Sequence, residues 1–165
     1  MTTNEADLAD ATRQALRRLA GAVVVITTRQ DGVRHAMAAT AVNALSMDPP
    51  SMLACVNKSA SIHDQLAKGG YFALNILGQD HVEVSHCCGG KVKGEARFEE
   101  GDWDDSGPVP VLNDAQAAII LKADGQFTYG SHSIFVGKVE EVRVHDGKID
   151  PLIYLNGSYT GVVGE

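Results

Sequence analysis

The chain has 165 residues and a formal net charge of −7, with 44% hydrophobic and 21% charged residues. This composition is typical of a globular protein, and the length predicts a single domain over residues 1–165 whose core needs no covalent staples. Because the charge is spread along the chain without a basic block, we expect no nucleic-acid partner.

The sequence also predicts no membrane association. The first residues lack the basic and apolar segments of a secretory signal, and no apolar run is long enough to cross a bilayer. Three cysteines, Cys55, Cys87 and Cys88, form an odd set without framework spacing, which indicates reduced thiols. We therefore expect a cytoplasmic protein.

Residues 1–20 are predicted to contain an N-terminal helix. Leucines and alanines recur at helical spacing from Glu5 to about Ala20, Thr3 or Asn4 can cap the start, and Gly21 is expected to end the helix. The remainder, residues 21–165, has the pattern of short antiparallel strands.

Apolar, β-branched and aromatic runs alternate with turn signals through that remainder. The predicted strands are residues 22–28, 33–41, 52–56, 71–76, 115–123, 126–129, 133–145 and 151–159. Short helices are predicted over residues 61–68, where Ser61 to Asp64 resembles a capping box, and over residues 80–87. A polar surface loop is expected over residues 89–109. This order predicts a mainly β fold with peripheral helices, closed into a Greek-key barrel.

Two small polar clusters lie on either side of the apolar run at residues 52–56. The first cluster is Thr40 to Asn43 with Ser46, and the second is Asn57, Lys58, Ser59 and Ser61. Between them Asp48-Pro49-Pro50 interrupts regular structure, because prolines remove backbone donors. We expect the two clusters to lie together. Taken alone, each is more simply explained as the polar end of an edge strand.

Several segments in a fixed order give the sequence a resemblance to a known family. They are V-V-V-I-T-T at 23–28, the small residues before S-M-D-P-P, F-A-L-N-I-L at 72–77, G-S-H at 130–132 and P-L-I-Y-L-N-G-S-Y at 151–159. From about Leu16 to Gly161 the chain resembles the short-chain flavin reductases. Members of that family use FMN or FAD with NADH or NADPH, and supply reduced flavin to two-component monooxygenases.

The resemblance implies a split β-barrel of the FMN-binding type, built as a homodimer with flavin at the subunit boundary. By position it implies that His132 lies near the nicotinamide and is the catalytic residue. Lys58 is expected at the flavin phosphate or at the pyrimidine edge of the ring. The implied cofactor-binding residues are Thr40, Ala41, Val42, Asn43, Ser46, Asn57, Lys58, Ser59, Ala60, Ser61, Ile62, His63, Lys91, Arg97, His132, Gly157, Ser158, Tyr159 and Thr160.

The sequence departs from the family pattern at two places. Ser131 stands where the family's G-D-H motif has an aspartate, so a carboxylate that would orient His132 is missing. Residues 86–90, His-Cys-Cys-Gly-Gly, stand where family members often carry an aromatic residue. The four nearby candidate ligands have poor metal-ligand spacing, so no metal site is expected at His81, His86, Cys87 and Cys88.

The sequence thus favours an NAD(P)H:flavin oxidoreductase whose reduced flavin diffuses to a partner monooxygenase. Hydride transfer depends on alignment more than on an acid–base pair, which fits the absence of a recognisable dyad. Two alternatives stay open at this stage. One is a carrier or electron-transfer protein that holds flavin tightly without nicotinamide turnover, and the other is a barrel that binds a different cofactor, such as haem. FMN and FAD are not distinguished, nor are NADH and NADPH.

Overall fold

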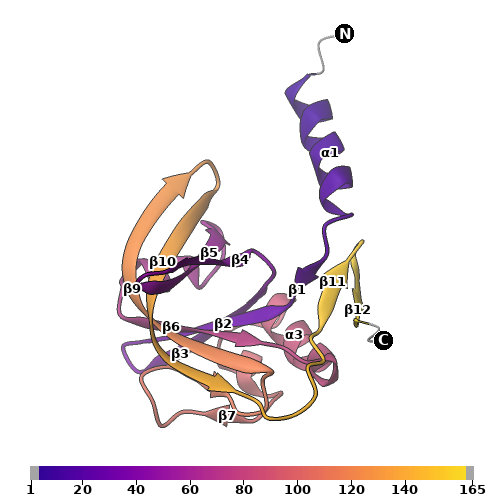
Figure 1. The fold of residues 1–165 in the computed structure, drawn as a ribbon. Coiled ribbons are helices and arrows are strands. Elements are labelled where there is room, and N and C mark those ends of the chain that lie inside the picture. Colours follow the sequence, from indigo (N-terminus) through magenta and orange to yellow (C-terminus); the bar gives the residue numbers. More distant parts are fainter. Residues whose placement is uncertain (1–3, 163–165) are drawn as a thin grey trace.

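The computed structural model describes residues 4–162, and a seven-stranded antiparallel sheet dominates them (Figure 1). The helices are α1 Glu5–Leu16, α2 His63–Ala67 and α3 Val82–Gly89, with the 3-10 helices η1 Gln79–His81 and η2 Gly94–Phe98. The strands are β1 Gly21–Ala22, β2 Val24–Gln30, β3 Val33–Ala39, β4 Val42–Met47, β5 Pro50–Asn57, β6 Tyr71–Ile76, β7 Trp103–Asp104, β8 Val111–Leu112, β9 Ala117–Tyr129, β10 His132–Val144, β11 Ile153–Leu155 and β12 Ser158–Thr160. Among these residues no helix has the length and apolar character needed to span a bilayer.

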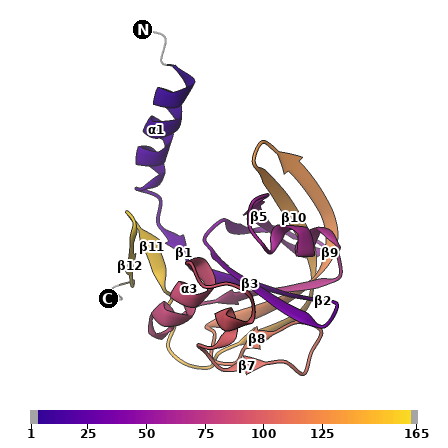
Figure 2. The ribbon, with the colours of Figure 1, turned by 180° about the vertical axis from the view of Figure 1, so that it is seen from behind.

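Strand β2 is buried on both faces, which explains its continuous apolar sequence. Val25 packs in a cluster with Val84 and Cys88 of α3, whereas Val24 and Ile26 pack in a second cluster inside the curled sheet. The core is therefore divided into two layers by β2 and its neighbours, with α3 covering one face (Figure 2).

The sheet has the order β3-β2-β6-β9-β10-β5-β4, and its two edge strands follow each other in the chain. Only Thr40 and Ala41 separate the end of β3 from the start of β4. Because a three-residue step spans at most about 11 Å, the two edges must approach each other here. The sheet is thus nearly closed into a barrel at Thr40 and Ala41.

The long hairpin of β9 and β10 supplies the bend that this closure needs. Register shifts lie between Val136 and Gly137 and between Val139 and Glu141. A Cβ on Gly137 would lie 2.6 Å from the ring of Phe72, so no side chain fits at this position. As an inner strand of the sheet, β10 pairs with β9 on one side and with β5 on the other.

Helix α1 extends away from the rest of the molecule (Figures 1 and 2), and none of its side chains is buried. Asn4 caps it by accepting a hydrogen bond from the Ala6 N–H at 2.6 Å, as one of the two predicted caps; Thr3 lies outside the described residues. The predicted end near Ala20 is wrong, because α1 ends at Leu16. The Arg17 carbonyl accepts the Asn156 N–H and its guanidinium donates to Asn156, so the chain is held by the β11–β12 turn instead.

Two further predictions needed correction. Residues 42–47 form β4, which was not predicted, because this strand lies at an edge and exposes most of its residues. The predicted loop at 89–109 contains η2 and β7, and its Phe98 packs edge-on against Trp103 with ring centroids 5.1 Å apart. Aromatic burial therefore orders part of a segment whose acidic composition indicated a solvated loop.

Candidate functional site

Two cavities meet at Thr40, where the edges of the sheet approach each other. One cavity of about 450 Å³ lies toward α3, and another of about 650 Å³ lies toward β5. Small-molecule sites in proteins commonly measure about 300–1,000 Å³. Each cavity is therefore large enough for a ring system.

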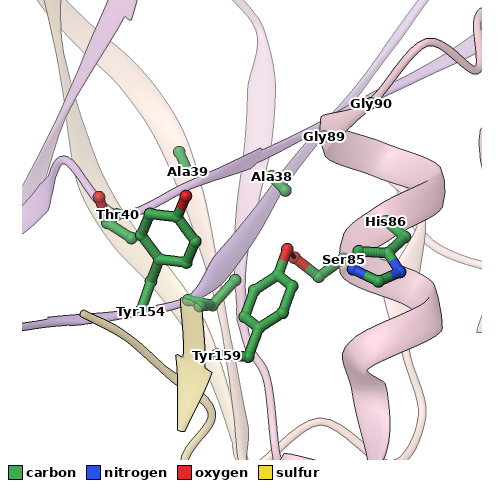
Figure 3. Close-up of a pocket in the computed structure, with 10 residues that line it drawn as sticks. Ala38, Ala39, Thr40, Ser85, His86, Gly89, Gly90, Tyr154 and Tyr159 are labelled. Atoms are coloured by element: carbon green, nitrogen blue, oxygen red, sulfur yellow. Dashed lines mark hydrogen bonds between the residues drawn. The ribbon is translucent and has the colours of Figure 1, made fainter. Parts of the chain in front are cut away.

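The cavity toward α3, which we call the aromatic cavity, has a floor of small residues (Figure 3). It is lined by Val23, Ala38, Ala39, Thr40, Ser85, His86, Gly89, Gly90, Tyr154 and Tyr159. A Cβ added to Gly89 would lie only 3.2 Å from the Cβ of Ala38, so β3 and α3 pass each other closely. The small side chains leave the floor open to a flat ligand.

Three rings stand along one wall of the aromatic cavity. The ring centroids of His86 and Tyr159 are 5.3 Å apart, and those of Tyr159 and Tyr154 are 5.4 Å apart. The Tyr159 hydroxyl lies 2.7 Å from the Ser85 hydroxyl, which fixes the ring against α3 (Figure 3). Aromatic faces held in this way favour planar, unsaturated ligands.

The cavity toward β5 combines an apolar wall with the first polar cluster. It is lined by Leu16, Leu19, Ala20, Gly21, Ala22, Thr40, Ala41, Val42, Asn43, Leu53 and Cys55. Thr40, Ala41, Val42 and Asn43, the predicted flavin residues of this cluster, therefore share one cavity. Thr40 also lines the aromatic cavity, so one residue borders both.

The second polar cluster lies beside the first, as expected. The Cys55 N–H donates to the Ala41 carbonyl at 2.8 Å, and the loop from Asn57 to Ser61 follows two residues after Cys55. The predicted interruption is a tight turn at Asp48-Pro49, and Pro50 already belongs to β5. Antiparallel pairing of β4 with β5 thus brings the two clusters together.

The segment from Asn57 to Ser61, called the polar loop below, presents donors to solvent. Asn57 Oδ1 accepts hydrogen bonds from both the N–H and the hydroxyl of Ser59, each at 2.9 Å, which folds the loop on itself. Lys58, Ser59 and Ser61 are exposed, and Ala60 is half-buried. Within residues 4–162 no carboxylate forms an ion pair with Lys58. Its charge is available to an anion on a protein of net charge −7.

His132 lies next to the polar loop in the sheet. It pairs with Asn57 in the register of β10 and β5, and the adjacent Lys58 N–H donates to the Ser131 carbonyl at 2.9 Å. The Ser131 hydroxyl lies 2.8 Å from His132 Nδ1. A hydroxyl therefore contacts the ring where the family motif has a carboxylate. Since a hydroxyl donates or accepts, this contact is compatible with either tautomer.

Ile62 and His63 turn inward. Ile62 is fully buried in the core and His63 is 8% exposed, so the Ile62 side chain faces away from both cavities. The predicted capping box at Ser61 is wrong, because α2 begins one residue later with Ile62 at its N-cap and no side chain bonded there. The Asp64 carboxylate instead lies 3.1 Å from His63 Nδ1.

Some predicted residues lie apart from this group. Ser46 stands at the other end of β4, where its hydroxyl bonds the backbone of Asp48. The Arg97 guanidinium donates to the carbonyls of Val92 and Ala36, so it holds η2 against β3. Lys91 is exposed just after α3, near the rim formed by Gly90. Only Lys91 of these three has a side chain without such intramolecular bonds among the described residues.

The C-terminal residues divide between two places. Tyr159 reaches the aromatic cavity. Gly157 forms the β11–β12 turn with Asn156, both at positive φ, and Ser158 and Thr160 are exposed on β12. A Cβ on Gly157 would lie 3.2 Å from the Arg17 guanidinium, so this turn packs on the chain just after α1.

Several lining residues were missed in the sequence. They are Val23, Ala38, Ala39, Ser85, His86, Gly89, Gly90 and Tyr154 in the aromatic cavity, and Leu16, Leu19, Ala20, Gly21, Ala22, Leu53 and Cys55 in the other. The pairs Ala38-Ala39 and Gly89-Gly90 were the available signal, because small residues mark close approaches of the backbone. The sequence pattern predicts no ligand contact for His86.

No group of three or more metal-ligating side chains occurs among residues 4–162. Burial raises the pKa of the Cys88 thiol to about 12. Burial also raises the pKa of Cys87, with a smaller contribution from nearby glutamates. Both thiols are therefore protonated near neutral pH and make poor nucleophiles.

Known proteins resemble the chain over most of its length. Residues 16–162 match the family model described as the flavin reductase like domain. The reductase component of an FADH(2)-dependent resorcinol hydroxylase from Rhizobium sp. (strain MTP-10005) is 38% identical over 151 residues, covering 89% of this chain and 83% of that protein. The FMN reductase (NADH) RutF of Pseudomonas syringae pv. syringae is 35% identical over 148 residues, with the same 89% and 83% coverage.

The solved structures agree with the sequence matches. A homologue of nitrilotriacetate monooxygenase component B from Mycobacterium thermoresistibile has a TM-score of 0.89 at 29% identity, covering 97% of this chain and 89% of that one. The predicted mainly β split barrel with peripheral helices is confirmed. Together, the matched residues and the barrel with its paired cavities show that the chain belongs to the flavin reductase-like domain family.

Proposed function

We propose that this protein catalyses NAD(P)H-dependent reduction of FMN or FAD and releases the reduced flavin to a partner monooxygenase. The observation that carries the proposal is the pairing of β5 with β10. It places the polar loop beside His132, close to the two cavities that meet at Thr40. The names of the resorcinol hydroxylase reductase component and of RutF support the same reaction class.

The residues at this position fit a flavin. Its ring would lie against Thr40 to Asn43, where small side chains expose the backbone, and its phosphate would meet Lys58 and the hydroxyls of Ser59 and Ser61. Because the whole protein carries a charge of −7, Lys58 supplies the local positive charge that a phosphate needs. Helix α2 has only five residues, so hydroxyls and Lys58 contribute more than its dipole.

Bound flavin would supply the hydride-accepting ring, with NADH or NADPH as donor. The chain's own contribution is alignment. The polar loop holds one end of the flavin, and His132 orients the nicotinamide beside it. The rings of the aromatic cavity exclude water from one side. No acid–base pair is required for this role, because positioning alone supplies a large part of the rate acceleration of a two-substrate reaction.

We propose NADH as the physiological donor, because the RutF relatives are named for it. FMN and FAD are both retained as substrates, since the relatives' names include each. Steady-state rates with the four combinations of flavin and nicotinamide would distinguish them. A preference for NADPH of tenfold or more in kcat/KM would contradict the choice of donor.

We also propose that the protein is a homodimer. Helix α1 buries none of its residues, and Leu8 and Leu16 are 58% and 57% exposed. A helix of 12 residues is marginal in water without a packing partner. A second copy is the occupant that the family resemblance implies. Sedimentation should give a dimer for the wild type and a smaller species for Leu8→Glu/Leu16→Glu, and a monomeric wild type would contradict this.

The reductase proposal is tested by mixing purified protein with NADH and added FMN or FAD in air. Sustained NADH oxidation that depends on flavin is expected. Tight flavin binding without nicotinamide oxidation, for every pair of flavin and nicotinamide, would favour the carrier alternative instead. A titration with FMN, FAD and riboflavin measures how much of the affinity comes from the phosphate, and equal affinity for FMN and riboflavin would remove Lys58 from the phosphate site.

A further inference from the structure

A series of hydrogen-bonded polar side chains, of which His63 and Ser133 are buried, lies next to His132 and the polar loop. Ser133 is 1% exposed, and its hydroxyl lies 2.9 Å from His63 Nε2 and 3.0 Å from the Thr128 hydroxyl. On its other side, His63 Nδ1 lies 3.1 Å from the Asp64 carboxylate. These hydrogen-bonded side chains thus connect α2 with β10 and β10 with β9.

The order of these groups is that of a nucleophilic Ser-His-Asp triad, but the surroundings are not. Ser133 lines neither cavity and is closed off from solvent, and its hydroxyl is shared with Thr128. A nucleophile needs an open face for its substrate. The burial of Ser133 therefore excludes a hydrolytic role, and its hydrogen bond to His63 has a structural role.

The direction of each hydrogen bond follows from the chemistry of the groups. An ionised Asp64 only accepts, so neutral His63 carries its proton on Nδ1 and accepts at Nε2. Ser133 then donates to His63, and Thr128 donates to Ser133. Asp64 is 87% exposed, so its contact contributes little compared with the buried one. The buried hydrogen bond between His63 and Ser133 therefore contributes most to holding these segments together.

The two partners of this bond each adjoin a part of the proposed site. His63 lies two residues after the polar loop ends, and Ser133 directly follows His132. A second bond, from the Lys58 N–H to the Ser131 carbonyl, ties the other end of the same segments. The polar loop and the start of β10 are therefore fastened on both sides of the pair formed by Asn57 and His132.

We propose that His63 is a positioning residue that, through Ser133, holds the polar loop in register with His132. This proposal rests on the proposed function, in which the loop binds flavin and His132 meets the nicotinamide. Loss of the bond should then weaken flavin binding and nicotinamide binding together, although His63 touches neither ligand.

The competing explanation is core packing, because the His63 ring also meets the ring of Phe135 edge-on at 5.3 Å. Two substitutions separate the explanations. In His63→Gln the amide reaches the position of Nε2 and keeps the bond to Ser133. In His63→Asn the amide reaches only the position of Nδ1 and keeps the contact with Asp64. Both remove the ring, so they lose the Phe135 contact equally.

Exchange of the Lys58 amide hydrogen reports on the fastening without any ligand. We expect His63→Asn to exchange about tenfold faster at this amide than His63→Gln, which is the size of effect that one hydrogen bond supports. Ser133→Ala keeps the ring packing and should match His63→Asn, so the result does not depend on whether one variant folds.

The flavin Kd and the nicotinamide KM should also rise about tenfold in His63→Asn and in Ser133→Ala, with values for His63→Gln within about twofold of the wild type. Equal exchange rates and equal Kd values in His63→Asn and His63→Gln would overturn the proposal. Wild-type turnover tests the proposed function separately. An inactive wild type whose Lys58 amide still responds as described would contradict the reductase but not the fastening.

Discussion

The two sides of Thr40 are built from different kinds of residue. On the β5 side, the polar loop and His132 offer charge, hydroxyls and an imidazole from two paired strands. On the α3 side, the aromatic cavity offers ring faces over a floor of alanine and glycine. In the proposed function the two sides have different roles: the polar side would bind the flavin and orient its hydride donor, and the rings of the aromatic cavity would exclude water from one side of them.

The largest effect is expected from His132→Ala. If His132 orients the nicotinamide, its loss should reduce kcat/KM for NADH about 100-fold, because small misplacements of the donor are costly. The flavin Kd should change less than twofold. Steady-state kinetics and flavin fluorescence measure the two quantities. His145→Ala is the matched control, since His145 is exposed and, among the described residues, its ring bonds only the Gly147 N–H of its own turn. Equal losses in both variants would contradict a special role for His132.

Lys58→Met should raise the flavin Kd about tenfold, because an exposed charge-assisted bond to a phosphate is worth roughly 1.5 kcal/mol, the lower end of the range for bonds to charged groups. The midpoint of thermal unfolding should stay unchanged, since Lys58 is exposed. Lys68→Met is the control, because Lys68 pairs with Asp31 outside the site. Riboflavin binding should be insensitive to Lys58→Met. An unchanged FMN affinity would remove the polar loop from the phosphate site.

A smaller effect on the aromatic side is expected from Tyr159→Phe, which removes only the hydroxyl bonded to Ser85. We expect the free energy of unfolding to fall by about 1 kcal/mol and ring binding to weaken about threefold. Ser85→Ala should have a similar effect, and the double variant should be no worse than either single one. Tyr154→Phe is the control, because the described residues offer the Tyr154 hydroxyl no hydrogen bond. Additive losses would show that the two hydroxyls do not act together.

The smallest effect concerns Cys88, a buried residue of α3 that packs in the same cluster as Val23 of the aromatic cavity. Its pKa is raised by burial to about 12. At a pH above about 9, the ordinary pKa of a thiol, the unfolded chain loses the Cys88 proton while the folded protein keeps it. The free energy of unfolding should therefore fall as pH rises through this window, by at most about 1.4 kcal/mol per pH unit.

Urea unfolding at several alkaline pH values measures this slope. Cys88→Ala should reduce the slope, although it lowers stability at every pH by leaving a cavity. Cys87→Ala should change the slope less, because Cys87 is only partly buried. The same alkaline slope in Cys88→Ala and the wild type would show that other groups cause it.

The comparison of the two sides also explains how far the sequence could predict the site. Thr40 to Asn43 and the polar loop could be proposed from the sequence because their polar residues are contiguous and flank one apolar strand. The floor of the aromatic cavity was missed, since Ala38 and Gly89 act through the side chains they lack and meet only in the folded chain. Strands buried in the sheet were predicted closely, as for β6 at residues 71–76. The edge strand β4 was not, because its exposed residues lack a clear apolar alternation.

The family resemblance predicts that the polar side binds flavin, but it does not predict the role of buried groups. Ile62 and His63 were expected to hold the flavin, and they face the core. Their burial accompanies the start of α2 at His63, where Ile62 joins the cluster inside the curled sheet and the His63 ring meets the ring of Phe135. Position along a motif therefore does not predict whether a side chain points toward the core or toward the surface.

The central claim is that hydride passes from a nicotinamide to a flavin beside the polar loop and His132. Anaerobic mixing of the flavin-loaded protein with NADH tests it most directly, with the loss of flavin absorbance followed in time. We expect rapid bleaching by the wild type and bleaching about 100-fold slower in His132→Ala at equal flavin occupancy. Flavin that binds fully but is not bleached by NADH or NADPH would contradict the claim.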